Sequence, residues 1–303
     1  MPSSNTSSAG AHLIGPAFVL LAAIGFSAKA ILVKLAYVYR VDAVTLLTLR
    51  MLLSLPLFLL MAWWSQRQGN VTPLTRREWL LVCVMGLAGY YLASLFDFLG
   101  LQYISAGLER LILFLNPTIV VLISAAFFHR AVTRRDVIAL VLSYAGVALV
   151  FWHDLKISPE GRVVLGSLLV LASAVSYAVY LTGSGRLIHK LGTLRYTAYA
   201  SIVSCLAIIV QFMLTRGLGE LAQPLPVYGY SVVMALFSTA LPILLMSEGI
   251  RRIGSSRTAM IATIGPILTI GLGYVFLDEA ITLPQVTGAL LVLAGVAIIT
   301  LKK

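Results

Sequence analysis

Ten runs of apolar residues alternate with short polar segments along the chain. A helix needs about 20 apolar residues to cross the hydrocarbon core of a bilayer, so each run predicts one membrane-spanning helix. The predicted helices lie near residues 12–38, 44–64, 78–101, 105–127, 134–152, 163–188, 195–215, 228–250, 255–276 and 282–301. Because only short loops remain between them, we expect an all-α integral membrane fold with no separate soluble domain.

The composition agrees with this fold class. Hydrophobic residues make up 60% of the 303 residues and charged residues only 11%, with a mean hydropathy of +0.98. Soluble domains carry roughly 25% charged residues, so an ordinary soluble protein is excluded. The net charge of +11 is compatible with a nucleic-acid partner, but the basic residues are scattered between apolar runs. We therefore expect a surrounding lipid bilayer and no bound nucleic acid.

The distribution of basic residues predicts the orientation of the chain. If the N-terminus is cytoplasmic, the cytoplasmic segments hold 14 lysines and arginines and the other side holds five. Lysine and arginine accumulate in cytoplasmic loops of membrane proteins. We therefore expect both termini in the cytoplasm, with residues 1–11 forming a short polar tail before the first span.

The two halves of the chain have similar sequences when each residue is compared with one a fixed number of positions later, as Ser27 is with Ser176. We call this fixed spacing the repeat offset. Residues related by this offset are repeat partners, and they include Ser27 and Ser176, Gly100 and Gly249, Pro117 and Pro266, and Thr133 and Thr282. Each half, 12–152 and 163–301, holds five predicted spans, and because five is odd the second half enters the membrane from the opposite face. The sequence thus predicts an inverted-topology repeat, on which many alternating-access transporters are built.

Two of the repeat partners, Pro117 and Pro266, are prolines inside predicted spans. Proline lacks an amide donor and clashes with the carbonyl one turn back, so the carbonyls of Leu113 and Ala262 lose their helical partners. Free backbone groups at that depth must be satisfied by protein or by a wet cavity. The pair predicts a central cavity beside both prolines, and a simple packing kink is the alternative.

Two segments resemble a known family of membrane proteins. LQYISAGLERLILFLNPTIVVLISAAFF (101–128) and RRIGSSRTAMIATIGPILTIGLGYVFLDEAITLPQVTGALLVLAGVAII (251–299) are similar to the fourth-to-fifth and ninth-to-tenth spans of EamA-type members of the drug/metabolite transporter superfamily. The resemblance extends over residues 12–301 and is greatest to YddG-like amino-acid exporters. It implies a ten-helix carrier of small organic solutes, often an exporter, in the bacterial inner membrane.

The second segment carries a run typical of the family, with Glu279, Thr282, Gln285 and Gly288 at regular spacing. Other positions depart from the family pattern. Arg130 stands in the first half where the second half has Glu279. Glu109 and Arg110 occupy positions that family members usually fill with small or apolar residues. These departures leave the identity of the solute open.

Ionisable side chains within spans are costly, and they mark functional sites unless they reach the interface. Lys29 lies deep in the first span, where it can pair with Asp97 or line a wet cavity, whereas Lys34 is expected to reach water at the interface. Asp97 lies toward the outer end of the third span and Glu248 toward the inner end of its repeat partner, the eighth, so they occupy roughly symmetric depths on opposite sides. They are the candidate gates and proton-coupling groups, and pairing with nearby bases such as Arg251 is the alternative.

The other charged residues near span ends are expected to have structural roles. Arg50 is predicted to join a charge network with Asp42 or Asp97. Glu109 and Arg110 begin the fourth span, where an acid favours the helix N-terminus, so capping and pairing at the rim are their expected roles. A direct contact with the solute is the alternative for both.

Aromatic and hydroxyl side chains within the spans are candidates for a substrate cavity. Tyrosine presents a ring face and a hydroxyl to an amphipathic solute. A hydroxyl or amide facing lipid would lack a hydrogen-bond partner. With Lys29 and the two prolines, the candidate cavity residues are Tyr90, Tyr91, Asn116, Tyr177, Tyr180, Ser238, Thr239, Ser247, Thr258 and Thr263. Packing between helices or against lipid is the alternative for each tyrosine.

Catalytic motifs are absent from the sequence. It contains no H-E-x-x-H, metal-spaced Cys/His cluster, nucleophile elbow or Walker motif, so we expect no enzyme, cofactor, bound metal or direct ATP coupling. The sequence favours a secondary exporter of small metabolites such as amino acids, aromatic ones included, by alternating access. The alternatives are an exchanger or importer of other small organic solutes and a non-transporting scaffold or sensor. Monomer and homodimer both stay open.

Overall fold

The structure, a computed structural model, describes residues 8–67, 73–129, 131–157 and 162–300. Within these ranges, ten helices are long and apolar enough to cross a bilayer, in agreement with the prediction. They extend over Ile14–Tyr37, Ala43–Arg67, Arg76–Gly100, Ala106–Phe127, Arg134–Ile157, Arg162–Leu191, Thr193–Thr215, Leu225–Gly254, Arg257–Leu277 and Leu283–Thr300. The chain is therefore a multi-pass α-helical membrane protein.

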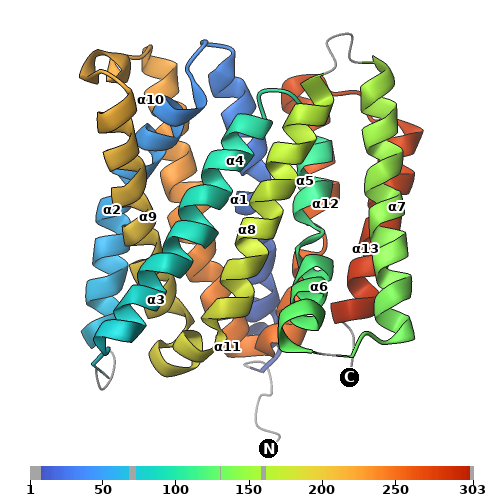
Figure 1. Ribbon diagram of the computed structural model, residues 1–303, viewed down its shortest axis with the longest axis horizontal. Helices are drawn as coiled ribbons and strands as arrows, with labels where there is room; N and C mark the ends of the chain where they lie inside the picture. The colour runs from blue at the N-terminus through green and yellow to red at the C-terminus, as the bar shows by residue number, and fades with distance from the viewer. Residues whose placement is uncertain (1–7, 68–72, 130, 158–161, 301–303) are drawn as a thin grey trace, which may run out of the picture.

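Several spans are built from more than one helical segment (Figure 1). In chain order the elements are α1 (Ser8–Tyr37), α2 (Ala43–Arg67), α3 (Arg76–Gly86), η1 (Leu87–Leu92), α4 (Ala93–Gly100), α5 (Ala106–Leu113), α6 (Asn116–Phe128), α7 (Arg134–Ile157), α8 (Arg162–Leu191), α9 (Thr193–Thr215), η2 (Leu218–Leu221), α10 (Leu225–Ala235), η3 (Leu236–Ala240), α11 (Leu241–Ala262), α12 (Gly265–Leu277) and α13 (Leu283–Thr300). η1 and η3 are π-helices that continue α3 and α10. α11 turns at Gly254, where φ is 80°, so its last residues begin the ninth span.

The bounds of the elements recur at the repeat offset. The first and last residues of α10 are the repeat partners of the first and last residues of α3. The first and last residues of α12 correspond in the same way to those of α6. The first residue of η3 is likewise the repeat partner of the first residue of η1. We call the face where α1 begins and α13 ends the terminal face (Figure 1). α3 begins at the terminal face and α10 begins at the opposite face, which is the relation that an inverted repeat requires.

The two π-helices lie at matching positions in the third and eighth spans. A π-turn leaves carbonyl groups without their usual helical partners, and inside a membrane a side chain must supply the donor. Ser176 Oγ donates to the Ala88 carbonyl in η1 at 2.7 Å, and Thr239 Oγ1 donates to the Met234 carbonyl before η3 at 2.9 Å. Such bulges occur frequently at functional sites, which draws attention to the middle of these two spans.

Two helix pairs form the ends of the bundle, and α1 and α8 lie between them (Figure 1). α2 packs against α9 at one end, and α7 packs against α13 at the other. α1 contacts η3, α11 and α12 of the second half, whereas α8 contacts η1, α4 and α6 of the first half. Each half therefore packs its first helix into the other half, and residues of both halves meet around these two helices.

Small residues bring α7 and α13 close together. A methyl group added to Gly146 would meet the Gly288 carbonyl, and one added to Gly295 would meet the Ala139 carbonyl. The two contacts are equivalent, because Gly146 and Gly295 are repeat partners and so are Ala139 and Gly288. Close approach of this kind is the usual role of glycine between membrane helices.

Candidate functional site

A cavity of about 130 Å³ lies between the two halves, at the level of the π-helices. It is lined by Phe26, Lys29, Arg50, Met51, Phe58, Tyr90 and Ser94 of the first half and by Tyr177, Ser201, Ser204, Ser238, Thr239 and Ile243 of the second. We call it the central cavity. Five of the predicted cavity residues lie in this lining, namely Lys29, Tyr90, Tyr177, Ser238 and Thr239. It brings two basic side chains, several hydroxyls and aromatic rings into one small space.

Arg50 faces the central cavity and does not have the acidic partner predicted for it. The residue is only 7% exposed. Its Nε donates to Thr239 Oγ1 at 3.0 Å, and its guanidinium carbon lies 5.4 Å from the centre of the Phe98 ring. The two acids predicted to bind it pair with other basic residues. In the part of the chain that the structure describes, Arg50 therefore forms no ion pair.

Three buried serines line the cavity without hydrogen-bond partners. Ser201 and Ser204 of α9 and Ser238 of η3 are each at most 2% exposed. Among the described residues, the Oγ of each serine lacks a partner. A buried polar group left unsatisfied costs roughly 1–3 kcal/mol, so a solute or water in the cavity would complete these three sites.

Tyrosines form one wall of the central cavity. The Tyr90 and Tyr177 rings line it, with ring centroids 6.4 Å apart. Tyr180 lies behind them, with its ring 5.0 Å from Tyr90 and its hydroxyl donating to Tyr90 Oη at 3.3 Å. Tyr91 packs instead into the apolar core that includes α2 and α9. Of the four predicted tyrosines, two line the cavity and one supports them.

Lys29 connects the cavity to two buried acids. Its Nζ pairs with Asp97 of α4 and, at 3.0 Å, with Glu109 Oε1 of α5. Asp97 is 3% exposed and Glu109 is 0% exposed, and Asp97 Oδ1 and Glu109 Oε2 have no partner within the described ranges. The capping role expected for Glu109 is wrong, because Ser105 Oγ caps α5 by accepting the Leu108 amide at 3.1 Å.

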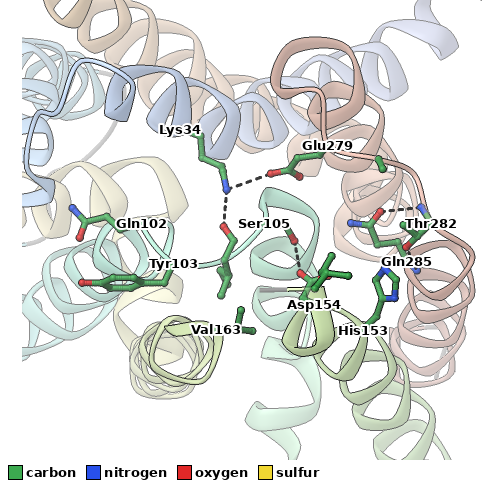
Figure 2. A pocket seen from close by; sticks show the side chains of 13 residues that line it. Lys34, Gln102, Tyr103, Ser105, His153, Asp154, Val163, Glu279, Thr282 and Gln285 are labelled. Carbon is green, nitrogen blue, oxygen red and sulfur yellow. Dashed lines mark hydrogen bonds and ion pairs between the residues drawn. The ribbon is translucent and has the colours of Figure 1, made fainter. Parts of the chain in front are cut away.

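A second polar cluster joins α1, α5 and the loop before α13 at the opposite face (Figure 2). Lys34 Nζ donates to the Ile104 carbonyl at 2.7 Å and lies 3.3 Å from Glu279 Oε1. The same Glu279 oxygen accepts the Ala106 amide at 3.0 Å. The Lys34 side chain is 25% exposed, in line with the expected position at the interface, and its ammonium also joins loop residues of the two halves.

This cluster borders a cavity of about 500 Å³ (Figure 2). Ser105 Oγ donates to Asp154 Oδ2 at 2.8 Å and so links α5 to α7. Thr282 and Gln285 form a capping box at the start of α13, with the Thr282 amide 3.3 Å from Gln285 Oε1 and the Gln285 amide 3.4 Å from Thr282 Oγ1. Residues of the run that begins at Glu279 thus hold this end of the bundle together.

A wider cavity of about 820 Å³ lies at the terminal face, between α1, α2, α9 and α11. We call it the vestibule. Its lining includes Arg195, Ser247 and Glu248. Ile243 lines the central cavity and the next residue, Leu244, lines the vestibule, so the two spaces are adjacent along α11. The buried pairs of Lys29 lie on the other side of the central cavity, toward the opposite face.

The segment that begins the fourth span and its copy that begins the ninth span differ in how deeply they are buried. Leu111 of α5 is 0% exposed, whereas its repeat partner Met260 is 42% exposed. Leu108 is also 0% exposed, and its partner Arg257 is exposed. Met260 and Arg257 line a further cavity of about 530 Å³ at the terminal face. The first copy closes the opposite face, and the second leaves the terminal face more open.

Comparison with known proteins places this architecture in a family. The sequence pattern of the EamA-like transporter family matches the chain twice, at residues 13–152 and 164–301. The chain belongs to the EamA-like transporter family. The ten spans and the cavity between two matched halves therefore belong to a membrane transporter.

Relatives of this EamA-like transporter occur in bacteria and archaea. The uncharacterized transporter YcbK of Bacillus subtilis is 32% identical over 280 residues, covering 90% of this chain and 88% of the relative. An uncharacterized transporter of Archaeoglobus fulgidus is 26% identical over 222 residues, covering 73% and 78%, respectively. One of Synechocystis is 26% identical over 319 residues, covering 96% and 94%. A solved crystal structure shares the fold, with a TM-score of 0.63 at 21% identity over 97% of this chain and 98% of that one.

Glu248 of the transporter lies in the wall of the vestibule. Its Oε1 lies 2.6 Å from Arg251 Nη2 and 2.6 Å from Arg252 Nε. The sequence left two roles open for Glu248, a gate or pairing with nearby bases, and the structure shows the pairing. Asp97 and Glu248 thus have different surroundings, because Asp97 is buried and Glu248 is partly exposed beside two exposed arginines.

The predicted residues at the two span breaks satisfy local backbone groups. Asn116 Nδ2 donates to the Leu113 carbonyl at 2.6 Å. Thr258 Oγ1 donates to the Gly254 carbonyl at 2.8 Å, and Thr263 Oγ1 donates to the carbonyl of Met260 at 2.6 Å. Pro117 and Pro266 lie in the first turns of α6 and α12, where a missing amide donor carries no cost. These five residues stand outside the lining of the central cavity, which lies around the tyrosines instead.

Some lining residues were not among the predicted cavity residues. Arg50 was assigned a structural role, and Ser201 and Ser204 were not singled out. The two serines are three residues apart, which places them on one face of a helix, and this spacing is the signal that points to them. Across the described ranges, no group of three or more His, Cys, Asp or Glu side chains could hold a metal ion.

Proposed function

We propose that this transporter moves small metabolites, including amino acids with apolar or aromatic side chains, by alternating access at the central cavity. The observation that supports this function is the position of the cavity. It lies between the two halves, adjoins the vestibule at the terminal face and is separated from the opposite face by buried ion pairs. Alternating-access carriers open a site between their repeats to one face at a time.

The size and chemistry of the cavity favour a small amphipathic solute. Pockets for drug-sized ligands measure about 300–1,000 Å³, whereas this one measures about 130 Å³. Its phenylalanine and tyrosine rings suit an apolar or aromatic group. Its arginine and hydroxyl groups suit a polar, negatively charged end. An amino acid with an apolar side chain combines both features.

For the direction of transport, we propose export across the bacterial inner membrane. The charge distribution supports a cytoplasmic terminal face, with 14 basic residues on that side and five on the other. The conformer with its vestibule at the terminal face would then load solute from the cytoplasm. Transition to a conformer open at the opposite face would release the solute outside.

Uptake into liposomes that contain the purified protein tests this function. We expect saturable flux of at least one labelled amino acid with an apolar or aromatic side chain, and no flux in protein-free liposomes. The panel should include a phosphorylated metabolite and a drug-like cation. Flux of only those two solutes would favour the exchanger or importer of other solutes, and no flux of any solute would favour a scaffold or sensor.

A further inference from the structure

Among the described residues, Arg50 has no ion pair, and it presents its guanidinium to the central cavity. A buried charge is stable only when it is paired or well hydrogen-bonded. Arg50 is 7% exposed, and in the described structure its one hydrogen bond runs from Nε to Thr239 Oγ1. The two terminal nitrogens of the guanidinium thus remain available to an acceptor that enters the cavity.

Among the described residues, the charged side chains that line the central cavity are both basic. Lys29 and Arg50 line it, and the charged group beside it also includes the two acids that contact Lys29. Asp97 and Glu109 are the acids of this group, and both pair with Lys29. Because Lys29 is paired, the guanidinium of Arg50 is the charge in the lining that an anionic group in the cavity would neutralise.

Hydroxyl donors stand in the same cavity as Arg50. Ser201, Ser204 and Ser238 line it, and among the residues described their Oγ atoms have no hydrogen-bond partners. Carboxylate oxygens accept hydrogen bonds from both guanidinium and hydroxyl groups, and the planar guanidinium fork matches a carboxylate in two parallel bonds. Arginine and unsatisfied serines together form a site with the chemistry of a carboxylate receptor.

A second arginine, which has no acidic partner within the described residues, lies on the route from the terminal face. Arg195 lines the vestibule and is 8% exposed. Its Nη2 donates to the Ser65 carbonyl at 2.5 Å, and in the described structure its Nε has no partner. Arg195 precedes Ser201 by six residues of α9, or about 9 Å along the helix axis. An anion that enters from the vestibule meets Arg195 first and Arg50 next.

We propose that Arg50 binds the carboxylate of the transported solute, with the hydroxyls of Ser201, Ser204 and Ser238 as further donors. Arg195 draws the anion into the vestibule. The inference rests on the proposed function, since it takes the central cavity as the transport site, and it specifies the group that the site recognises. An amino group on the solute is not part of this proposal, because among the described residues the lining of the central cavity holds no acidic side chain.

Binding to the purified full chain tests this site with two probes of the same shape. 3-Phenylpropionate carries a carboxylate, and 3-phenylpropionamide replaces it with a neutral amide. We expect the carboxylate alone to raise the unfolding temperature of the wild type, because a ligand that binds only the folded state stabilises it. Arg50→Met should weaken carboxylate binding by roughly 10- to 150-fold, the range for a charged hydrogen bond. Arg50→Lys keeps the charge but loses the fork, so it should restore binding only in part.

Two further variants keep the test independent of folding defects. Arg67→Met removes an exposed arginine from the same helix and should bind the carboxylate as the wild type does. The double variant Ser201→Ala/Ser204→Ala makes two small changes and should weaken carboxylate binding several-fold. Equal stabilisation of the wild type by both probes, or by neither, overturns the proposal. Unchanged carboxylate affinity in Arg50→Met and in the double variant overturns it as well.

Flux through liposomes separates this proposal from the proposed function. Carboxylate binding that depends on Arg50, without measurable flux of any solute, would support the site and contradict transport. Amino-acid flux with an unchanged KM in Arg50→Met would support transport and contradict the site.

Discussion

Lys29 binds Asp97 and Glu109 at the same time, and these ion pairs join α1 to α4 and α5. Each carboxylate keeps one oxygen without a hydrogen-bond partner among the described residues. A proton on either oxygen would neutralise that carboxylate and weaken its attraction to Lys29. At the scale of single residues, this cluster is therefore the place where proton binding and opening of the opposite face can be linked, and Asp97 remains our proposed coupling residue.

We expect Asp97→Asn and Glu109→Gln each to reduce the pH dependence of flux, because an amide mimics the protonated acid at every pH. Glu248→Gln is the matched control. Glu248 was the other candidate coupling residue, but it pairs with two exposed arginines at the vestibule and should leave the pH dependence as in the wild type. Initial rates in liposomes at set internal and external pH provide the measurement. Loss of pH dependence in Glu248→Gln alone would place coupling at the terminal face.

At the scale of elements, the fourth and ninth spans break at equivalent positions but stabilise the break differently. In the first half, Asn116 donates to the Leu113 carbonyl at 2.6 Å. In the second half, Gly265 replaces the asparagine, and its own carbonyl accepts a hydrogen bond from Ser27 Oγ at 3.1 Å. The first break is closed by a local side chain, whereas the second is joined to α1 of the other half.

Asn116→Ala should destabilise the protein more than Pro117→Ala does. Removal of the amide leaves the Leu113 carbonyl without its donor, which costs about 1–3 kcal/mol. Pro117→Ala keeps that bond and changes only the first turn of α6. Thermal unfolding in detergent, followed by circular dichroism, compares the two. Pro117→Ala should also retain the affinity of cavity ligands, so weaker binding in that variant would revive the cavity predicted beside the prolines.

At the scale of the whole molecule, the two halves share the bounds of several elements but pack differently. The segment around Leu111 is buried within the bundle, whereas its copy around Met260 borders a cavity at the terminal face. The charged residues account for part of this difference, since Lys29, Asp97 and Glu109 have Ala178, Met246 and Thr258 as repeat partners. The buried ion pairs of Lys29 thus lie toward the opposite face, and we expect that face to open by breaking them.

Single cysteines should reveal which face is cytoplasmic. In a Cys83→Ala/Cys205→Ala background, Val132→Cys at the terminal face should react with a membrane-impermeant maleimide only in inside-out vesicles. Leu218→Cys at the opposite face should react only in intact cells. Both positions are exposed, at 45% and 67%, so reagent access rather than burial decides the result. The reverse pattern would contradict the orientation inferred from the basic residues.

The spans and the repeat could be predicted because each can be recognised from the order of residues along the chain alone. Apolar length identifies a span without knowledge of its neighbours, and the repeat offset reappears in the bounds of α3 and α10. Depth within a span was predictable for the same reason, so Tyr90, Tyr177 and Ser238 could be named as candidates for the cavity that they line.

Partners of charged side chains could not be predicted in this way. Glu109 lies 80 residues from Lys29, and its sequence position at a helix start favours a cap. Only the packing of α1 against α5 brings the two charges together in a buried site. Arg50 likewise meets Thr239 from a helix of the other half. Which face of a helix is buried, and against which neighbour, follows from the three-dimensional packing of both halves, because residues distant along the chain must share the same buried space.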